Sequence, residues 1–249
     1  MKNAKSGKLI ILAGPSCVGK SPLAKSMAKF FPEFYRHLKM LVMYNSRDPR
    51  PGELDGIDYH FRSRKEINKL RDDDDFLVLD ARGDLQAVDL RKLKDQLDEG
   101  DVFYEGNPFA AAEMIDHPGL MDIPKLDVFM SPVSRNEILY LKEHKVSLPD
   151  VITDVMRRKL LRRTRRQKNE LSLNDLQNIE KRASSAYQEL RQACRFTYIL
   201  PNHDGEDSEN WDAFYFPLGD ARKSLLCFLD LIKGAQSSVI ETWEENLMD

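Results

Sequence analysis

The stretch from Gly14 to Ser21 has the residue types and the spacing of a loop that holds phosphate groups. It matches the pattern G-x-x-x-x-G-K-[ST] at every fixed position. Its glycines allow the backbone to turn successive N–H groups toward phosphate oxygens. Lys20 supplies a positive charge for the terminal phosphates, and the hydroxyl of Ser21 is suited to ligate Mg²⁺. The segment predicts a nucleoside triphosphate site with contacts from Gly14, Ser16, Cys17, Val18, Gly19, Lys20 and Ser21.

This loop needs a strand before it and a helix after it, and the sequence predicts both. The apolar run 9–13 has the length of a buried strand. Apolar residues at helical spacing predict a helix from about Ser21 to Phe30, which Pro32 ends. Pro22 fits the first helical turn, because the N–H that proline lacks would have no partner there. The start of this helix adds a positive dipole end to the loop.

A second candidate anion site lies in the segment 45–61, whose prolines and glycines predict a structured loop. Arg47 and Arg50 are three residues apart around an Asp-Pro step, and Tyr59 is at the far end. Guanidinium groups bind phosphate through two parallel hydrogen bonds, and a tyrosine hydroxyl adds a directional donor. An acceptor that carries its own phosphate requires such a site beside the triphosphate. Taken alone, the segment would be better explained as a solvated turn with charges of both signs.

Arginines also recur at helical spacing between Met156 and Lys168. They predict a basic helix face that folds down on a polyphosphate, where positioned cations stabilise phosphoryl transfer. A basic helix that is only solvated, or that touches RNA, would have the same pattern.

The remaining chain alternates predicted strands with predicted helices. This order predicts an α/β fold, with a parallel sheet flanked by helices. The C-terminal segment 237–249 is expected to be a terminal helix. The strands are expected at 40–43, 76–79, 101–105, 126–130 and 196–200, and further helices at 63–70, 90–97, 110–115, 136–143, 150–165, 174–194 and 221–232.

Composition limits the class of protein. The chain has 249 residues, 32% of them charged, yet its net charge is only −3, which argues against a general nucleic-acid or membrane binder. Its three cysteines are widely spaced and suggest a reducing compartment. No apolar run approaches the roughly 18 residues that span a bilayer. We therefore expect a cytoplasmic protein, monomeric or homodimeric, without nucleic-acid or membrane partners.

Taken together, these segments resemble the guanylate kinase family of P-loop kinases, in order from about residue 8 to 235. The run from Arg47 to Phe61 resembles the family's acceptor-phosphate loop almost position for position. The resemblance implies ATP and Mg²⁺ as cofactors and a small phosphorylated acceptor, namely GMP or a modified relative. Residues 129–134 resemble the strand before the family's lid, and residues 158–164 resemble the lid signature. Residues 179–182 resemble the returning lid helix, and residues 198–202 resemble the strand that reaches the adenine.

The resemblance also implies roles for individual residues. Arg47, Arg50 and Tyr59 would hold the acceptor's phosphate, and Asn202 would lie near the adenine. Glu53 is a further expected substrate-binding residue. The implied catalytic residues are Lys20, Arg47, Arg158, Arg162 and Arg182. The whole chain 1–249 would form a single domain, with a core of 8–44, 76–135 and 195–235, an acceptor-binding region of 45–90 and a lid of 155–182.

Two departures from the family concern the acceptor's base. The family reads the guanine edge with a serine, a glutamate and a serine or threonine. The matching positions here are Met43, Leu77 or a neighbour of it, and the run 86–88. Two guanine donors without acceptors would weaken GMP binding by a factor on the order of 10² to 10⁴. Asp80 and Asp84 are the carboxylates close enough in sequence to replace the lost glutamate.

Glu105 ends the strand where the family carries aspartates near magnesium, so we expect it to ligate Mg²⁺ together with Ser21; an exposed strand-end glutamate is the alternative. The Gly-Asn after it also resembles the ribose 1,5-bisphosphate phosphokinases, which act on a sugar phosphate. A non-enzymatic alternative is an interaction module like the guanylate-kinase-like domains of membrane-associated scaffolds. The intact Lys20 and Ser21 argue against such a module.

Cys17 stands where the family frequently has glycine. One interpretation is a small residue that the loop tolerates. The other is a redox-sensitive thiol, whose pKa the helix N-terminus and Lys20 would lower.

Overall fold

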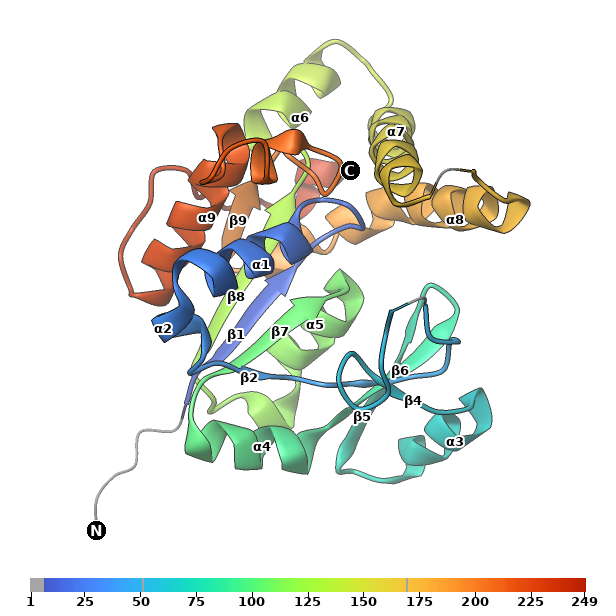
Figure 1. Cartoon of the computed structure of the whole chain (residues 1–249), viewed down its shortest axis with the longest axis vertical. Helices are drawn as coiled ribbons and strands as arrows, with labels where there is room; N and C mark the ends of the chain where they lie inside the picture. The colour runs from blue at the N-terminus through green and yellow to red at the C-terminus, as the bar shows by residue number, and fades with distance from the viewer. Residues whose placement is uncertain (1–6, 51, 169) are drawn as a thin grey trace.

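A five-stranded parallel sheet forms the centre of the fold (Figure 1). The structure is a computed structural model that describes residues 7–50, 52–168 and 170–249. Across the sheet the strands are β2 (Lys39–Met40), β7 (Val102–Gly106), β1 (Leu9–Ala13), β8 (Lys125–Ser131) and β9 (Tyr198–Pro201). All of their pairings are parallel, and the run that precedes the phosphate loop is the central strand β1. The predicted α/β class is confirmed.

The alternation of side chains along β1 explains why helices cover both faces of this sheet. Leu9, Ile11 and Ala13 belong to one buried cluster, and Ile10 and Leu12 belong to another. The first cluster packs against α4 (Leu90–Glu99) and α5 (Pro108–Asp116), and the second packs against α1 (Lys20–Phe30) and α9 (Gly219–Ile232). The short helix α2 (Pro32–Tyr35) follows α1.

A second, four-stranded sheet lies beside the first (Figure 1). In spatial order its strands are β4 (His60–Phe61), β3 (Tyr44–Asn45), β6 (Asp84–Asp89) and β5 (Phe76–Ala81). Strand β6 runs antiparallel to both of its neighbours. Helix α3 (Arg64–Lys69) packs on this sheet through Ile67 and begins with the predicted capping box of Ser63 and Glu66. Residues 76–89, which the sequence analysis assigned both to the core and to the acceptor-binding region, therefore belong to this second sheet.

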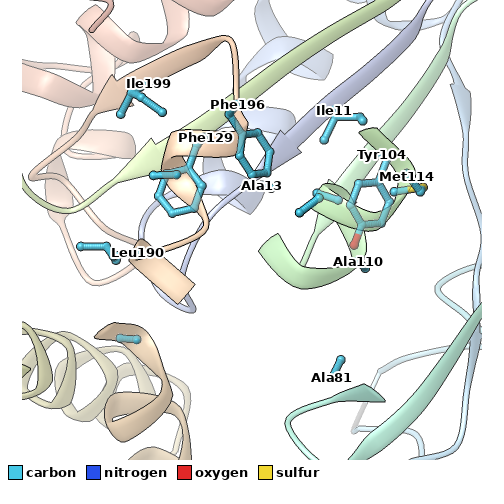
Figure 2. Packing of buried hydrophobic residues seen from close by; sticks show 14 of the residues in the cluster. Ile11, Ala13, Ala81, Tyr104, Ala110, Met114, Phe129, Leu190, Phe196 and Ile199 are labelled. Carbon is cyan, nitrogen blue, oxygen red and sulfur yellow. The ribbon is translucent and has the colours of Figure 1, made fainter. Parts of the chain in front are cut away.

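Two long helices that pack against each other lie above the second sheet in Figure 1. They are α7 (Leu148–Gln167) and α8 (Leu173–Leu190), and α6 (Arg135–Glu143) precedes them. The inner end of α8 is fixed to the core, because Leu190 is fully buried there near Phe129 and Phe196 (Figure 2). These two rings pack edge to face with centroids 5.3 Å apart.

The C-terminal segment corrects one expectation, because 237–249 does not form a terminal α-helix. Glu241 instead makes an isolated bridge with Ile199, with backbone hydrogen bonds of 2.9 Å in both directions, and only 245–248 form a 3₁₀ turn. Trp243 is buried in the core, and its Nε1 donates to Glu241 at 2.9 Å, which favours the extended path. No helix in the described part of the chain is long and apolar enough to cross a membrane.

Candidate functional site

The predicted phosphate loop joins the carboxyl end of β1 to α1, where parallel α/β sheets bind ligands. Gly19 has φ 113°, and a Cβ there would lie 2.5 Å from Nδ2 of Asn202, so both conformation and space require glycine. Lys20 is buried, and its Nζ donates to the carbonyls of Gly14 and Pro15 at 2.8 Å. Burial lowers the pKa of Lys20, while the nearby carboxylate of Glu206 acts in the opposite direction.

Ser21 and Glu105 lie together at the start of α1. The Ser21 hydroxyl donates to Oε1 of Glu105 at 2.6 Å, and burial raises the pKa of the Glu105 carboxyl. In the described residues no group of three or more His, Cys, Asp or Glu side chains is placed to hold a metal. Mg²⁺ at a phosphate site takes one or two protein oxygens, and substrate phosphates and water complete its shell. A hydroxyl beside a carboxylate therefore fits Mg²⁺.

Cys17 does not have the properties of a redox-sensitive thiol. Its side chain is fully buried, and burial, followed by the nearby Glu206 carboxylate, raises the pKa of Cys17 to about 12. The helix N-terminus and Lys20 do not offset this desolvation, so the thiol stays protonated at neutral pH. The interpretation of Cys17 as a small residue held inside the loop is the one that the structure supports.

A cavity of about 700 Å³ opens beside the phosphate loop and extends to the second sheet. It gathers most of the predicted site into one space, although the phosphate-loop and acceptor-loop residues are far apart in sequence. Pro51, which belongs to the acceptor-loop motif, lies outside the described residues. The predicted residues that line the cavity are Gly14, Ser16, Cys17, Lys20, Ser21, Arg47, Arg50, Glu53, Tyr59, Asp84, Glu105 and Arg182.

The acceptor loop is organised around Arg47. Its guanidinium forms a two-point ion pair with Glu53, at 2.6 and 2.7 Å, and lies over the ring of Tyr59 at 5.1 Å. Glu53 also accepts from the backbone N–H of Arg50 at 2.7 Å. Burial alone would raise the pKa of Glu53. The hydrogen bonds with Arg47 and Arg50 outweigh this effect, so the pKa of Glu53 is lowered overall. The pair thus holds a rigid, charged arginine at the wall of the cavity.

Several predicted residues lie outside the cavity. Asp80 is half exposed and faces Arg64 at 3.5 Å, whereas Asp84, after the turn, lines the cavity. Asn202 is fully buried behind the loop and donates to the carbonyls of Val18 and Asp204, at 2.7 and 2.6 Å. It braces the phosphate loop from behind.

The lid arginines differ from expectation in which face they present. Arg158 is 59% exposed and pairs with Asp154, and Arg162 is 57% exposed and pairs with Asp207. Arg163 is the arginine of α7 that lines the cavity, where it pairs with Glu206 at 2.7 Å. Helical periodicity explains this difference. The buried residues Met156 and Leu160 define the inner face of α7, and Arg163 lies on that face. Arg158 lies on the opposite face, and Arg162 lies at the side, where it pairs with Asp207.

Arg182 of α8 is a cation of the site that has no counter-charge paired with it in the described residues. It lines this cavity and an adjoining one of about 930 Å³. Among the described residues no carboxylate pairs with it and no acceptor takes a hydrogen bond from its side chain. Burial and then the charges of Arg50, Arg163 and Arg82 lower the pKa of Arg182 to about 9. Four guanidinium groups thus converge where an anion would be stabilised.

Sequence reasoning missed other residues of the cavity wall, namely Asn45, Asp48, Asp58, Arg82, Gln86, Asn107, Asn178, Lys181 and Glu206. The inner face of α7, read from its apolar residues, would have indicated Arg163. Glu206 follows β9 in an irregular segment, and no pattern in the sequence points to it.

A phosphate loop after the central strand of a parallel α/β sheet defines a P-loop nucleotide-binding protein. The guanylate kinase family model matches residues 6–84. The guanylate kinase of Nitratidesulfovibrio vulgaris is 30% identical over 213 residues, which cover 83% of this chain and 84% of that protein. This chain therefore belongs to the guanylate kinase family.

Two other comparisons extend over most of the chain. The guanylate kinase of a Synechococcus species is 25% identical over 215 residues, 86% of this chain and 84% of that protein. The crystal structure of guanylate kinase from Anaplasma phagocytophilum superposes with a TM-score of 0.54 at 15% sequence identity. It covers 94% of this chain and 89% of that one, and at this identity it supports the fold alone.

Proposed function

We propose that this protein transfers the γ-phosphoryl group of MgATP to the phosphate of GMP or a modified relative, and so forms the nucleoside diphosphate. The observation that carries the proposal is the position of Arg182. A partly buried, unpaired arginine that shares one cavity with Arg50, Arg82 and Arg163 and with the phosphate-loop Lys20 requires an anion to complete it. The family relatives are guanylate kinases by name, so we propose neither the sugar-phosphate kinase nor the interaction module.

The chemistry needs no nucleophile from the protein. A phosphate oxygen of the acceptor attacks the γ-phosphorus while the bond to the β–γ bridging oxygen breaks and ADP leaves. The protein positions the two phosphates and stabilises the charge that develops between them. Bound at Ser21 and Glu105, Mg²⁺ would supply positive charge to the β- and γ-phosphate oxygens.

Each wall of the cavity has a proposed role in this transfer. Lys20 and the loop N–H groups hold the triphosphate. Arg47, Arg50 and Tyr59 hold the acceptor's phosphate, and Glu53 fixes the direction of Arg47. On the opposite wall, α7 and α8 supply the cations that cover the transferred group, with Arg163 from α7 in the place expected for Arg158 and Arg162. We accordingly propose α7 and α8 as the lid and β3 to β6 with α3 as the acceptor-binding region.

We assign recognition of the base to Asp84 rather than Asp80. The N1–H and N2–H groups of guanine are donors and require acceptors when buried. Asp84 and Gln86 line the cavity on β6, and among the described residues neither side chain has a hydrogen-bond partner. Asp80 is already engaged, because its carboxylate accepts from the N–H of Gly83 at 2.7 Å. Asp84 is thus the carboxylate available to a guanine.

The proposal is tested by MgATP-dependent ADP release with GMP, dGMP, AMP, UMP, dTMP and ribose 1,5-bisphosphate, with Lys20→Ala as the blank. We expect turnover with GMP and its deoxy form. Turnover with the sugar phosphate alone, or with no acceptor while ATP binds, would overturn the proposal.

The pair Asp84 and Asp80 offers a matched comparison on one hairpin. Asp84→Asn replaces one acceptor oxygen with a donor, so we expect KM for GMP to rise by about 10- to 10²-fold, from a loss of about 1–3 kcal/mol. Asp80→Asn should leave this KM unchanged. Equal effects of the two substitutions would refute the assignment of Asp84 to the base.

Glu105→Gln should raise the Mg²⁺ requirement. Glutamine keeps the shape of the side chain but binds cations poorly, and we expect apparent Mg²⁺ affinity to fall on the order of 10- to 10²-fold. Because burial already disfavours the charged form of Glu105, the metal-free variant should unfold at the wild-type temperature or above. The measurement is the rate against free Mg²⁺ at fixed ATP, with the exposed Glu113→Gln as the control. A wild-type Mg²⁺ dependence would exclude Glu105 as a ligand.

A further inference from the structure

Arg82 occupies an unfavourable position at the tip of the hairpin between β5 and β6. Ala81 pairs with Asp84, so Arg82 and Gly83 form a two-residue turn, and their φ angles are 59° and 83°. Positive φ at both positions is typical of the type I′ turn, for which Asn-Gly is preferred. An arginine in the left-handed region is strained by about 1 kcal/mol or more. Local turn chemistry therefore does not explain arginine at this position.

The side chain of Arg82 is held across a long sequence distance by the lid helix α8. Its Nε donates to Oε1 of Glu189 at 2.5 Å, and the same oxygen accepts from the hydroxyl of Ser185 at 2.8 Å. The Glu189 side chain is fully buried, and the Arg82 side chain is 18% exposed. A buried ion pair at one nitrogen fixes the plane of the guanidinium group.

The other end of the same guanidinium has no partner. Within the described residues, no acceptor takes a hydrogen bond from either terminal nitrogen of Arg82. Arg82 lines the cavity together with Lys20 and Arg182. Its charge contributes to lowering the pKa of both of these cations, after the larger effect of burial. Because Nε is held by Glu189, the terminal nitrogens are the part of this cavity-lining side chain that is left free to bind a ligand.

We propose that Arg82 is a catalytic residue whose terminal nitrogens bind the phosphate oxygens of the reacting groups, and that Glu189 is a positioning residue that orients it through Nε. The inference rests on the proposed phosphoryl transfer and adds a cation from the acceptor-side hairpin to those from the phosphate loop, the acceptor loop and the lid. In this proposal the strained turn has a function, because it brings the terminal nitrogens of Arg82 to the cavity. A purely structural bridge between the hairpin and α8 is the competing explanation.

The two explanations differ for the double variant Arg82→Asn with Glu189→Gln. It removes both charges together, so that no buried carboxylate is left alone, and it creates the preferred Asn-Gly turn. We expect a melting temperature close to or above that of the wild type, and a loss of kcat/KM of about 10²-fold with the acceptor. The dissociation constant for ADP, measured calorimetrically, should change little.

Lys145→Asn is the matched control. Lys145 is another basic residue with positive φ, at 55°, but it is exposed in the turn after α6, outside the cavity. This substitution should relieve backbone strain without changing turnover.

Glu189→Gln alone should lower kcat by about tenfold, because Arg82 keeps its charge but loses its orientation.

The outcomes separate this inference from the proposed function. A double variant that remains folded and turns over like the wild type would overturn the role of Arg82. If the double variant does not fold, Arg82→Lys distinguishes the two explanations, because lysine keeps the positive charge but lacks the two terminal nitrogens of the guanidinium group. A loss of about tenfold or more in kcat/KM then supports the inference, and wild-type kinetics overturn it. Absence of turnover by the wild type would instead overturn the proposed function, and this inference with it.

Discussion

Replacing Arg182 with methionine is expected to lower kcat by about 10³-fold, the scale of an arginine that stabilises a transferring phosphoryl group. The same substitution should stabilise the ligand-free protein by about 1 kcal/mol, because it removes a partly buried charge that has no partner in the described residues. The pKa of Arg182 is lowered to about 9, so folding disfavours the charged form. This penalty is fully present at neutral pH and fades as the pH rises above about 9.

Steady-state kinetics and thermal unfolding of the same preparations measure both effects. The control is Arg191→Met at the end of α8, where the arginine is 48% exposed and pairs with Asp249 at 3.0 Å, outside the cavity. It should change neither kcat nor the unfolding midpoint appreciably. A methionine variant at position 182 that is less stable than the wild type, or that retains its kcat, would contradict the role given to this arginine.

Arg47→Ala is expected to raise KM for the acceptor by about 10²- to 10³-fold, from the loss of a charged, two-point contact worth about 3–4 kcal/mol. KM for ATP should stay close to the wild-type value, because Arg47 lies on the acceptor side of the cavity. This split distinguishes lost acceptor binding from general unfolding of the site.

The matched control lies in the same region of the chain. Arg62 is 43% exposed and pairs with Asp55 away from the cavity, so Arg62→Ala should leave both KM values unchanged. Equal rises in the KM for ATP and for the acceptor in Arg47→Ala would show that the substitution disturbs the whole site, and not acceptor binding.

The sequence predicted the parallel sheet and most of the cavity because those features depend on local patterns. The phosphate loop follows from glycine geometry and the run of apolar residues before it. Helix α3 could be placed from its capping box, which depends on two residues three positions apart. The acceptor loop was predicted from its resemblance to the family's loop, and in the structure its residues Arg47, Glu53 and Tyr59 interact within one short segment.

Features that depend on long-range packing could not be predicted in this way. Where a terminal helix was expected, Glu241 instead forms a bridge with Ile199. Strand β6 pairs with β3 in a second sheet that local patterns do not indicate. The pKa of Cys17 depends on burial that the helix N-terminus alone does not reveal. Arg82 has no signal in sequence, because its partner Glu189 is 107 residues away.

The most direct test of the central claim follows the γ-phosphoryl group itself. Wild-type protein, Lys20→Ala and Arg182→Met are incubated with MgATP labelled in the γ-phosphate and with GMP, and the products are separated. The account predicts that the wild type transfers the label to GDP, that Lys20→Ala transfers none, and that Arg182→Met transfers it slowly. Label that appears only in inorganic phosphate, or that remains in ATP while both nucleotides bind, would contradict direct transfer in this cavity.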